Sequence, residues 1–184
     1  MKKNQESSSH PLRVMRYCPK CGSDLFAEND VRSKRCGRCG FTFYLNCATA
    51  VVGVIVRDGA LLMTRRAEEP HRGMWDLPGG FVEFGETVEE ALKREIREEL
   101  SIDVRIERYL FSQPNVYAFS SLDVRTSDLF FLCTTGAGAE LVPSDDVASA
   151  EFVPIGEIDV EKIGLSSIRK AVTFLQKHTE MLEK

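Results

Sequence analysis

Long hydrophobic runs are absent from this chain of 184 residues. No apolar stretch approaches the roughly 18 residues that a membrane-spanning helix needs. The amino terminus, MKKNQESSSH, is polar and lacks the hydrophobic segment of a secretion signal. The sequence therefore predicts a soluble cytoplasmic protein with no membrane partner, whose cysteines are mostly reduced or bound to metal.

Histidine is also scarce, since the chain has only three. None of them stands in a recognisable catalytic pattern with a serine or cysteine, so no nucleophilic triad can be argued. No helix-turn-helix segment that would read DNA is visible. What is present is an apolar content of 43%, typical of a globular protein, and a length that allows one ordinary domain with a small appendage.

The cysteines gather near the amino terminus in two C-x-x-C knuckles that are separated by fourteen residues. Four thiolates at this spacing predict a zinc ribbon, in which each knuckle gives two sulfurs to one structural Zn²⁺. About 30 residues cannot bury enough core to fold alone, so the metal supplies folding energy. Iron in a rubredoxin-like site is an alternative, whereas disulfides do not suit a cytoplasmic chain. The predicted zinc ligands are Cys18, Cys21, Cys36 and Cys39.

The domain organisation follows from these boundaries. Residues 1–16 are expected to be a disordered lead-in, 17–47 the zinc ribbon, and 48–184 the main domain. Residues 1–47 carry a net charge of +5, and the remaining residues carry −9. The basic ribbon suits a contact with nucleic acid or a substrate phosphate, but it equally suits packing against the acidic domain that follows it.

One helix carries charge where it should carry hydrocarbon. Thr87 and Glu90 form the pattern of a capping box at its start, and Val88 and Leu92 begin an apolar stripe. The next two positions on that stripe are Glu95 and Glu99, with no basic residue three or four positions away from either. A half-buried carboxylate costs several kcal/mol unless a positive charge meets it, so this face predicts a bound divalent cation.

The neighbouring residues complete the predicted cation site. Glu98 adds a third oxygen donor at the edge of the same face, and Arg94, four residues earlier, can hold it in place. Oxygen donors without histidine or cysteine favour Mg²⁺ or Mn²⁺, which recruit a substrate phosphate.

This stretch also resembles a known family. Gly80, Glu86 and the run REIREELSI at residues 94–102 match the signature box of the Nudix hydrolases, except that Ser101 stands where the family usually has Gly. That position favours positive φ, so serine should cost up to about 1–2 kcal/mol or end the helix differently. The resemblance implies metal ligands at Glu95, Glu98 and Glu99, a backbone carbonyl ligand at Gly79 or Gly80, orienting roles for Glu86 and Arg94, and a homodimer.

Strand and helix patterns fill the rest of the chain. Expected strands cover residues 48–57, 60–66, 104–111, 127–135 and 151–154, and an amphipathic helix covers 163–182. Alternating strands and two substantial helices predict an α/β protein with a mixed sheet between helices. By resemblance this is the Nudix α/β/α sandwich, preceded by a small zinc ribbon.

Four further residues are candidates for substrate binding, and one is a candidate metal ligand. Residues 112–114, Ser-Gln-Pro, resemble the start of a segment found in the NADH pyrophosphatase group, although Asn115 stands where that group has Trp. Gln113 is therefore a candidate, as are Tyr117 and Phe119, which can stack on a base or fill the core. Arg65 suits an anionic substrate or a solvated rim. Asp146 is a candidate metal ligand, although a solvated loop explains it equally well.

The predicted function is metal-assisted hydrolysis of the pyrophosphate bond in a nucleoside diphosphate that is linked to another group, such as NADH, NAD or ADP-ribose. Glu98 is the expected catalytic base, because it sits at the edge of the ligand face, although a loop acid could serve. Two alternatives remain: a regulatory Nudix domain that binds nucleotide without hydrolysis, and an RNA-end or cap-processing protein that uses the basic ribbon.

Overall fold

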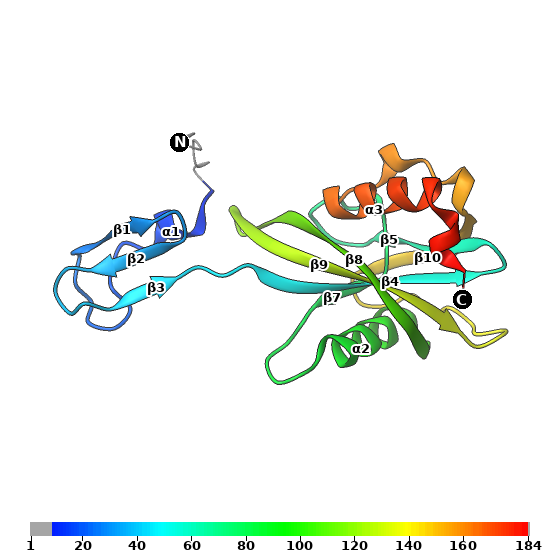
Figure 1. The fold of residues 1–184 in the computed structure, drawn as a ribbon, viewed down its shortest axis with the longest axis horizontal. Helices are drawn as coiled ribbons and strands as arrows, with labels where there is room; N and C mark the ends of the chain where they lie inside the picture. Colours follow the sequence, from blue (N-terminus) through cyan, green and yellow to red (C-terminus); the bar gives the residue numbers. More distant parts are fainter. Residues whose placement is uncertain (1–8, 184) are drawn as a thin grey trace. The chain divides into compact units, whose positions relative to one another are not determined.

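The computed structural model describes residues 9–183, which divide into two compact units. The first unit contains the residues up to 47 together with 116–125, and the second contains 48–115 and the residues from 126 onward. Figure 1 shows the elements of both units in sequence colours. Among residues 9–183, no helix combines the length and hydrophobicity that crossing a membrane requires.

The first unit is a small antiparallel sheet with a short helix. Strands β1 (Phe26–Asp30), β2 (Ser33–Cys36) and β3 (Thr42–Tyr44) pair in that order, and α1 covers Pro11–Val14. The Lys34 ammonium group is buried against α1, where it donates to the carbonyl of Met15 at 2.6 Å. This contact satisfies a backbone acceptor just past the end of α1 and ties the helix to the sheet.

Part of the expected disordered lead-in, residues 9–16, has regular structure. Pro11–Val14 are helical, and the Leu12 side chain is buried, so this part of the lead-in has defined structure. Residues 1–8, which complete the expected lead-in, lie outside the described residues. The division of the chain at residues 16 and 47 stays a prediction, and residues 116–125 group with the first unit although they lie within the predicted main domain.

The second unit is built on a mixed sheet in which β10, β5, β4, β9 and β8 lie in that order. Strand β4 runs parallel to β9 and antiparallel to β5 and to the short strand β7, while β6 pairs with β5. The strands are β4 (Ala48–Arg57), β5 (Ala60–Arg66), β6 (Trp75–Asp76), β7 (Gly79–Phe81), β8 (Val104–Phe119), β9 (Leu122–Thr135) and β10 (Val147–Pro154).

Two helices cover opposite faces of this sheet, as Figure 1 shows. Helix α2 (Val88–Leu100) buries Leu92, Ile96 and Leu100 against one face, and α3 (Ser166–Lys177) buries its apolar side against the other. Short 3-10 turns cover residues 155–157, 160–162 and 179–182. The expected α/β/α sandwich with a mixed sheet is thereby confirmed.

The element boundaries agree with the sequence where local signals are strong. Strands 48–57 and 60–66 form as predicted, and Asp58 and Gly59 turn between them with positive φ. The prediction that a strand ends at residue 111 is wrong, because β8 continues to Phe119 and turns into β9 at Ser120 and Ser121. Both serines have positive φ, 50° and 63°, which a two-residue hairpin turn requires.

The last strand and helix also differ from their predicted bounds. Strand β10 begins at Val147, four residues before the expected start. The predicted helix over 163–182 is confined to Ser166–Lys177, and a 3-10 turn follows it after His178.

Candidate functional site

The glycine turn before α2 brings backbone and carboxylates together. Gly79 has φ of 143°, and a Cβ there would lie 2.0 Å from the Val51 carbonyl oxygen in the neighbouring strand. A Cβ on Gly80 would lie 2.5 Å from the Glu95 carboxylate. Only glycine allows the approach at Gly79, because a Cβ there would meet backbone, whereas a Cβ at Gly80 would displace the Glu95 carboxylate. Gly79 therefore sets the position of β7 against β4, and Gly80 leaves room for the Glu95 carboxylate.

Helix α2 begins as its sequence predicts. The Thr87 hydroxyl accepts from the Glu90 backbone N–H at 3.2 Å, and the Glu90 carboxylate accepts from the Thr87 N–H at 2.8 Å. Both halves of the capping box are therefore present. This start fixes which residues of α2 face the sheet, and Glu99 is among them.

Glu99 is a buried carboxylate with only 5% of its surface exposed. The Gly79 backbone N–H donates to it at 3.0 Å, and no arginine, lysine or histidine within residues 9–183 pairs with it. Burial raises the pKa of Glu99 well above its ordinary value, and the nearby Asp146 carboxylate raises it further. A buried acid surrounded by other acids is the environment that a bound cation relieves.

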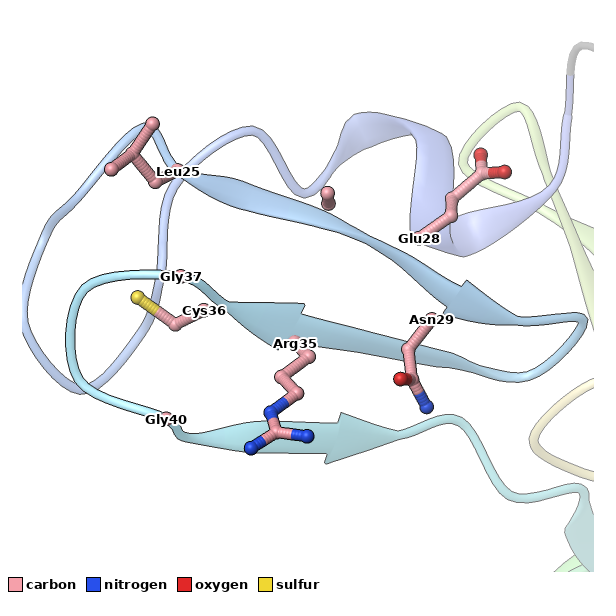
Figure 2. Close-up of a pocket in the computed structure, with 8 residues that line it drawn as sticks. Leu25, Glu28, Asn29, Arg35, Cys36, Gly37 and Gly40 are labelled. Carbon is pink, nitrogen blue, oxygen red and sulfur yellow. The ribbon is translucent and has the colours of Figure 1, made fainter.

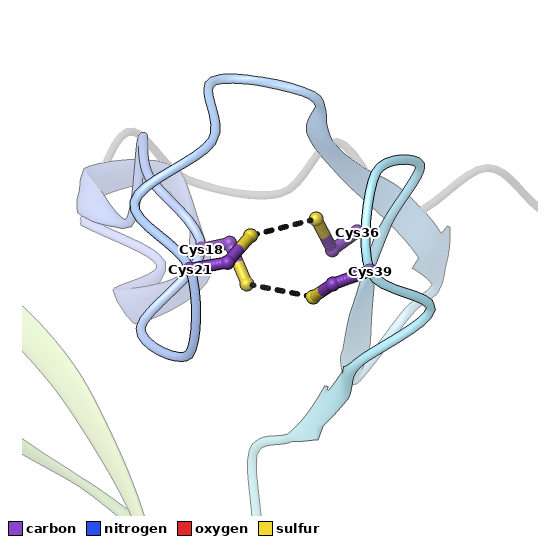
Figure 3. A group of neighbouring side chains, drawn as sticks. All are labelled: Cys18, Cys21, Cys36 and Cys39. Atoms are coloured by element: carbon purple, nitrogen blue, oxygen red, sulfur yellow. Dashed lines mark hydrogen bonds between the residues drawn. The ribbon is translucent and has the colours of Figure 1, made fainter.

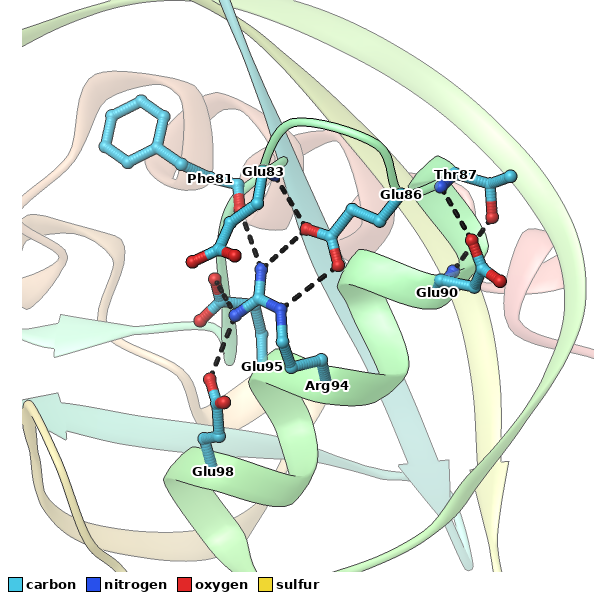
Figure 4. Close-up of polar contacts among 8 residues, drawn as sticks. All are labelled: Phe81, Glu83, Glu86, Thr87, Glu90, Arg94, Glu95 and Glu98. Atoms are coloured by element: carbon cyan, nitrogen blue, oxygen red, sulfur yellow. Dashed lines mark hydrogen bonds and ion pairs between the residues drawn. The ribbon is translucent and has the colours of Figure 1, made fainter.

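Arg94 organises the exposed side of the site (Figure 4). Its guanidinium group donates to Glu95 and to Glu98, each at 2.9 Å, and to Glu86 at 2.8 and 3.1 Å. The predicted contact between Arg94 and Glu98 is confirmed. From the sequence, Glu95 was expected to lack a basic partner, because no basic residue lies three or four positions away. That expectation is wrong, because the adjacent Arg94 pairs with Glu95.

The same arginine links α2 to the loop before it. Glu86 accepts from the Glu83 backbone N–H at 2.7 Å, and Arg94 donates to the Phe81 carbonyl at 3.1 Å. The Arg94 guanidinium lowers the pKa of the Glu86 carboxyl, which keeps this ion pair charged. Glu86 and Arg94 therefore hold the loop and the helix in a fixed arrangement, as their predicted orienting role requires.

Asp146 lies on the loop before β10 and faces the same acids. Its negative charge raises the pKa of Glu95, after burial and the neighbouring Glu98, and it also raises that of Glu99. Its backbone carbonyl accepts from the Ala67 N–H at 2.7 Å, which fixes the loop to the end of β5. The structure thus brings the predicted loop acid into the electrostatic field of the predicted helix acids.

A buried ion pair behind the glycine turn was not anticipated from the sequence. The Arg66 guanidinium donates to the Asp76 carboxylate at 2.8 Å and to the Pro70 carbonyl at 2.7 Å. Both residues are buried, and burial raises the pKa of Asp76 despite its arginine partner. The only sequence signal for this pair is that Arg66 and Asp76 are charged residues at the ends of strands β5 and β6. The pair fixes the loop between β5 and β6.

The donor set at the end of α2 suits a hard divalent cation. Its side-chain donors are carboxylate oxygens, with backbone oxygens of the glycine turn nearby, and no histidine or cysteine contributes. The oxygens are not tightly gathered. In residues 9–183, the only group of three or more His, Cys, Asp or Glu residues whose ligand atoms lie within 4.8 Å of one another is a set of thiols. Arg94 occupies Glu95 and Glu98, and a cation would compete with it for their oxygens.

That set of thiols is the predicted cluster of Cys18, Cys21, Cys36 and Cys39 (Figure 3). The Sγ atoms of Cys18 and Cys39 lie 3.7 Å apart, as do those of Cys21 and Cys36. A tetrahedral ion with metal–sulfur distances of about 2.3 Å separates its sulfurs by about 3.8 Å. The six cysteines are free thiols, so disulfide pairing is not found.

The two knuckles share one backbone geometry. Gly22 and Gly40 have φ of 70° and 72°, and their N–H groups donate to the carbonyls of Cys18 and Cys36 at 2.8 and 3.0 Å. The Cys39 backbone N–H lowers the pKa of the Cys36 thiol to about 6, with a smaller contribution from Arg38. Amides that point at a sulfur stabilise its thiolate form, which is the form that binds metal.

The four candidate substrate residues are divided between the two units. The Arg65 guanidinium stacks 3.8 Å from the Trp75 ring centroid and donates to the Gly73 carbonyl at 3.1 Å, so it supports its own loop. Gln113 belongs to the second unit, whereas Tyr117 and Phe119 group with the first. Their roles in substrate binding stay predictions.

An open depression lies on the sheet of the first unit (Figure 2). Charged side chains of both signs line it, and the cluster residue Cys36 is the only predicted site residue among them. It therefore carries no separate candidate chemistry. The lining residues are Leu25, Ala27, Glu28, Asn29, Arg35, Cys36, Gly37 and Gly40.

Known proteins resemble the chain in sequence and in fold. An ADP-ribose pyrophosphatase of Methanocaldococcus jannaschii is 39% identical over 131 residues, which cover 67% of this chain and 74% of that protein. An NAD-capped RNA hydrolase NudC of Vibrio vulnificus is 34% identical over 145 residues, which cover 78% of this chain. The chain spans about half of the length of that relative, 52%.

A solved structure of a NUDIX hydrolase from Nitrosomonas europaea matches the fold. Its TM-score is 0.72 at 23% identity, and the match covers 90% of this chain and 93% of the other. The model of the NUDIX domain matches residues 48–174, which contain the glycine turn, the acidic end of α2 and Asp146. On this match, the chain belongs to the NUDIX domain family.

Proposed function

We propose that the chain is a metal-dependent pyrophosphohydrolase that cleaves the diphosphate bond of a nucleoside diphosphate linked to a second group, of the ADP-ribose or NAD type. The observation that carries the proposal is the buried Glu99 carboxylate, which faces Glu95 and Asp146 without a cationic partner in the described residues. The names of two relatives, an ADP-ribose pyrophosphatase and an NAD-capped RNA hydrolase, support this substrate class.

Mg²⁺ or Mn²⁺ is the proposed catalytic cofactor, because the donors are oxygens. Glu95, Glu98, Glu99 and Asp146 would hold it, together with a backbone carbonyl of Gly79 or Gly80. Such an ion supplies charge neutralisation at the phosphates and lowers the pKa of water. The chain itself supplies the orientation of the donors, because Gly79 holds Glu99 through a backbone hydrogen bond and Arg94 holds Glu95 and Glu98.

Glu98 is the proposed general base. Its side chain is 51% exposed, so it can reach a water molecule at the edge of the site, and Arg94 fixes its orientation from 2.9 Å. The base must lie within hydrogen-bonding reach of the water that it deprotonates. Asp146 is the alternative base, since it is a loop acid whose charge acts on Glu95 and Glu99.

We further propose that the four thiols bind one structural Zn²⁺ and that residues 17–47 form a zinc ribbon of the kind found in the NADH pyrophosphatase group. The tetrahedral spacing of the sulfurs and the paired knuckles support this assignment. Four protein ligands close the site and leave no open position for chemistry. The homodimer that the family resemblance implies also stays a prediction.

The function is tested by offering a panel of substrates to the purified chain with Mg²⁺ or Mn²⁺. The panel contains ADP-ribose, NADH, NAD, dinucleoside polyphosphates and nucleotide sugars, and the products are identified by mass. AMP with ribose 5-phosphate indicates ADP-ribose cleavage, and AMP with a nicotinamide mononucleotide indicates cleavage of the dinucleotide. Nucleotide binding without product formation would contradict hydrolysis and favour a regulatory domain.

Processing of NAD-capped RNA is a second candidate, favoured by the NudC relatives and by exposed basic side chains on the first unit. Arg32 lies 5.9 Å from the ring centroid of the exposed Tyr44, a combination that suits a single-stranded backbone and base. This candidate predicts that capped RNA is cleaved with a higher kcat/KM than free NAD. The advantage should fall steeply as salt rises, because phosphate contacts release counterions.

A further inference from the structure

The carboxyl end of α2 is closed by the loop that precedes β10, residues 141–146. The last carbonyl groups of a helix have no partner within the helix. The Ser144 N–H donates to the Glu99 carbonyl at 2.8 Å, and the Val142 N–H donates to the Leu100 carbonyl at 3.0 Å. The Ser144 hydroxyl donates to the Glu98 carbonyl. The loop therefore satisfies three consecutive carbonyls, two of which belong to proposed metal ligands.

The same loop presents Asp146. The Val147 N–H donates to the Ser144 carbonyl at 3.1 Å, which closes a turn over residues 144–147. Within this turn Asp145 has φ of 54°, a left-handed conformation that aspartate and asparagine adopt more readily than other non-glycine residues. On its far side, the Asp146 carbonyl is fixed by Ala67 at 2.7 Å. The turn is thus held from both ends.

We propose that Ser144 is a positioning residue, which holds the Asp146 turn against the carboxyl end of α2 so that the Asp146 carboxylate stays near Glu95 and Glu99. Ser144 contributes through its backbone and its side chain to two adjacent helix residues. Two such bonds fix the orientation of the turn as well as its distance from the helix. The inference rests on the proposed function, because it assumes that Asp146 helps to bind the catalytic cation.

A helix cap without this role has different consequences. Loss of a cap lowers stability but leaves the intrinsic affinity of a separate metal site unchanged. Loss of a positioning contact lets Asp146 move away from Glu95 and Glu99, so the affinity for the cation falls even in a folded chain. Metal affinity in the absence of substrate therefore separates the two roles.

The experiment measures Mn²⁺ binding to the full chain, loaded with ribbon zinc and without nucleotide, from the electron paramagnetic resonance signal of free Mn²⁺. Ser144→Ala should weaken binding about three- to tenfold, the equivalent of one hydrogen bond. Ser144→Thr keeps the hydroxyl and should restore most of the affinity. Ser149→Ala is the matched control, because it removes a hydroxyl from β10 outside the turn, and it should bind as the parent does.

A double-mutant cycle with Asp146→Asn completes the test. In the Asp146→Asn background, Ser144→Ala should cause no further loss of affinity, because the group that it positions is already neutral. An equal loss in both backgrounds would show that Ser144 only stabilises the helix end and would overturn the inference. The inference also fails if Asp146→Asn alone leaves Mn²⁺ affinity unchanged. The proposed hydrolysis fails separately, if the parent chain forms no product with the substrate panel.

Discussion

The thiol cluster and the acidic end of α2 are two candidate metal sites that the fold prepares in opposite ways. The four sulfurs lie within 4.8 Å of one another, and Cys18 and Cys36 are buried, so the backbone alone assembles the cluster. The carboxylates instead range from the buried Glu99 to the half-exposed Glu98, and an arginine separates them. One site is closed and complete, whereas the other is open and charged.

The difference between the two sites follows from the charge of their donor groups. Before a metal binds, a cluster of thiols carries less negative charge than a cluster of carboxylates, so thiols gather at a lower electrostatic cost. Carboxylates repel one another, and a site that must admit a phosphate cannot bury them all. The chain resolves the conflict by burying Glu99, pairing Glu95 and Glu98 with Arg94, and supplying Asp146 from a loop. The open site therefore retains the freedom that catalysis requires.

The largest expected effect comes from breaking the closed site. Cys39→Ser removes an exposed thiol, so it disturbs little packing, but it deletes one of four zinc ligands. Structural zinc contributes about 10–16 kcal/mol to such small units. The variant should lose its zinc, measured by atomic absorption, and residues 17–47 should become sensitive to protease.

Cys47→Ser is the matched control, since Cys47 is an exposed thiol outside the cluster. It should retain one zinc per chain and resist protease as the parent does. A Cys39→Ser chain with full zinc content and an intact ribbon would contradict the assignment of the cluster as a zinc site.

The open site is broken most sharply by Glu99→Gln. Glutamine keeps the size of the side chain and can still accept from the Gly79 N–H, but it removes one ligand charge. Turnover should fall by about 10²–10³-fold or more, because the Glu99 carboxylate is proposed to hold the cation that neutralises charge developing on the phosphates. The measurement is kcat on the best substrate of the panel. Glu89 is an exposed acid on the same helix, so Glu89→Gln should keep the parent rate. A Glu99→Gln chain with the parent rate would refute the assignment.

Arg94→Lys tests whether the carboxylates need a fixed partner. Lysine retains the charge but cannot donate to Glu86, Glu95 and Glu98 at once, as the planar guanidinium does. A displaced donor set should lower kcat about 10- to 100-fold. Arg97→Lys alters an exposed ion pair on the same helix and should change kcat little. Equal effects of the two substitutions would remove the special role of Arg94.

The pH dependence of stability offers a smaller test of the same comparison. Burial raises the pKa of Glu99 in the folded chain above its ordinary value of 4.5. The stability that Glu99 contributes is therefore full below pH 4.5 and is lost as pH rises through the higher folded pKa. At neutral pH, without Mg²⁺ or Mn²⁺, Glu99→Gln should be more stable than the parent by about 1–3 kcal/mol. Thermal unfolding across pH measures this, and a difference that does not grow with pH would contradict it.

The sequence predicted those parts of the fold and site whose signals are local. The capping box at Thr87, the turn at Asp58 and Gly59, and the spacing of the thiols are patterns within a few residues, and the structure contains each of them. The length of β8 was missed because Ser120 and Ser121 form a turn that usually carries Asn or Gly.

Ion pairs that follow no spacing rule were the other failure. Arg66 in β5 and Asp76 in β6 are ten residues apart in the sequence, and no spacing rule predicts that they pair. The Arg94–Glu95 contact joins neighbours that normally point away from each other on a helix. Such contacts depend on how the glycine turn packs against α2. The sequence therefore identified the acidic helix face and Asp146 as candidates but did not reveal what compensates their charge.

The smallest expected effect lies at the end of α2, where serine replaces the usual glycine. Ser101 adopts φ of 57° and its N–H donates to the Arg97 carbonyl at 2.9 Å, so the helix keeps the left-handed ending in spite of the side chain. Ser101→Gly should remove about 1 kcal/mol of strain, partly offset by the greater freedom of glycine when unfolded. The melting temperature should rise by about 1–3 °C, measured by calorimetry.

Ser101→Ala keeps the strain, and it should melt no higher than the parent. If the glycine variant is no more stable than the alanine variant, Ser101 carries no strain. If the glycine variant is more stable and kcat is unchanged, the cap at Ser101 and the arrangement of the carboxylates are energetically separate. The loop at residues 141–146, rather than the cap, then holds the carboxylates in place.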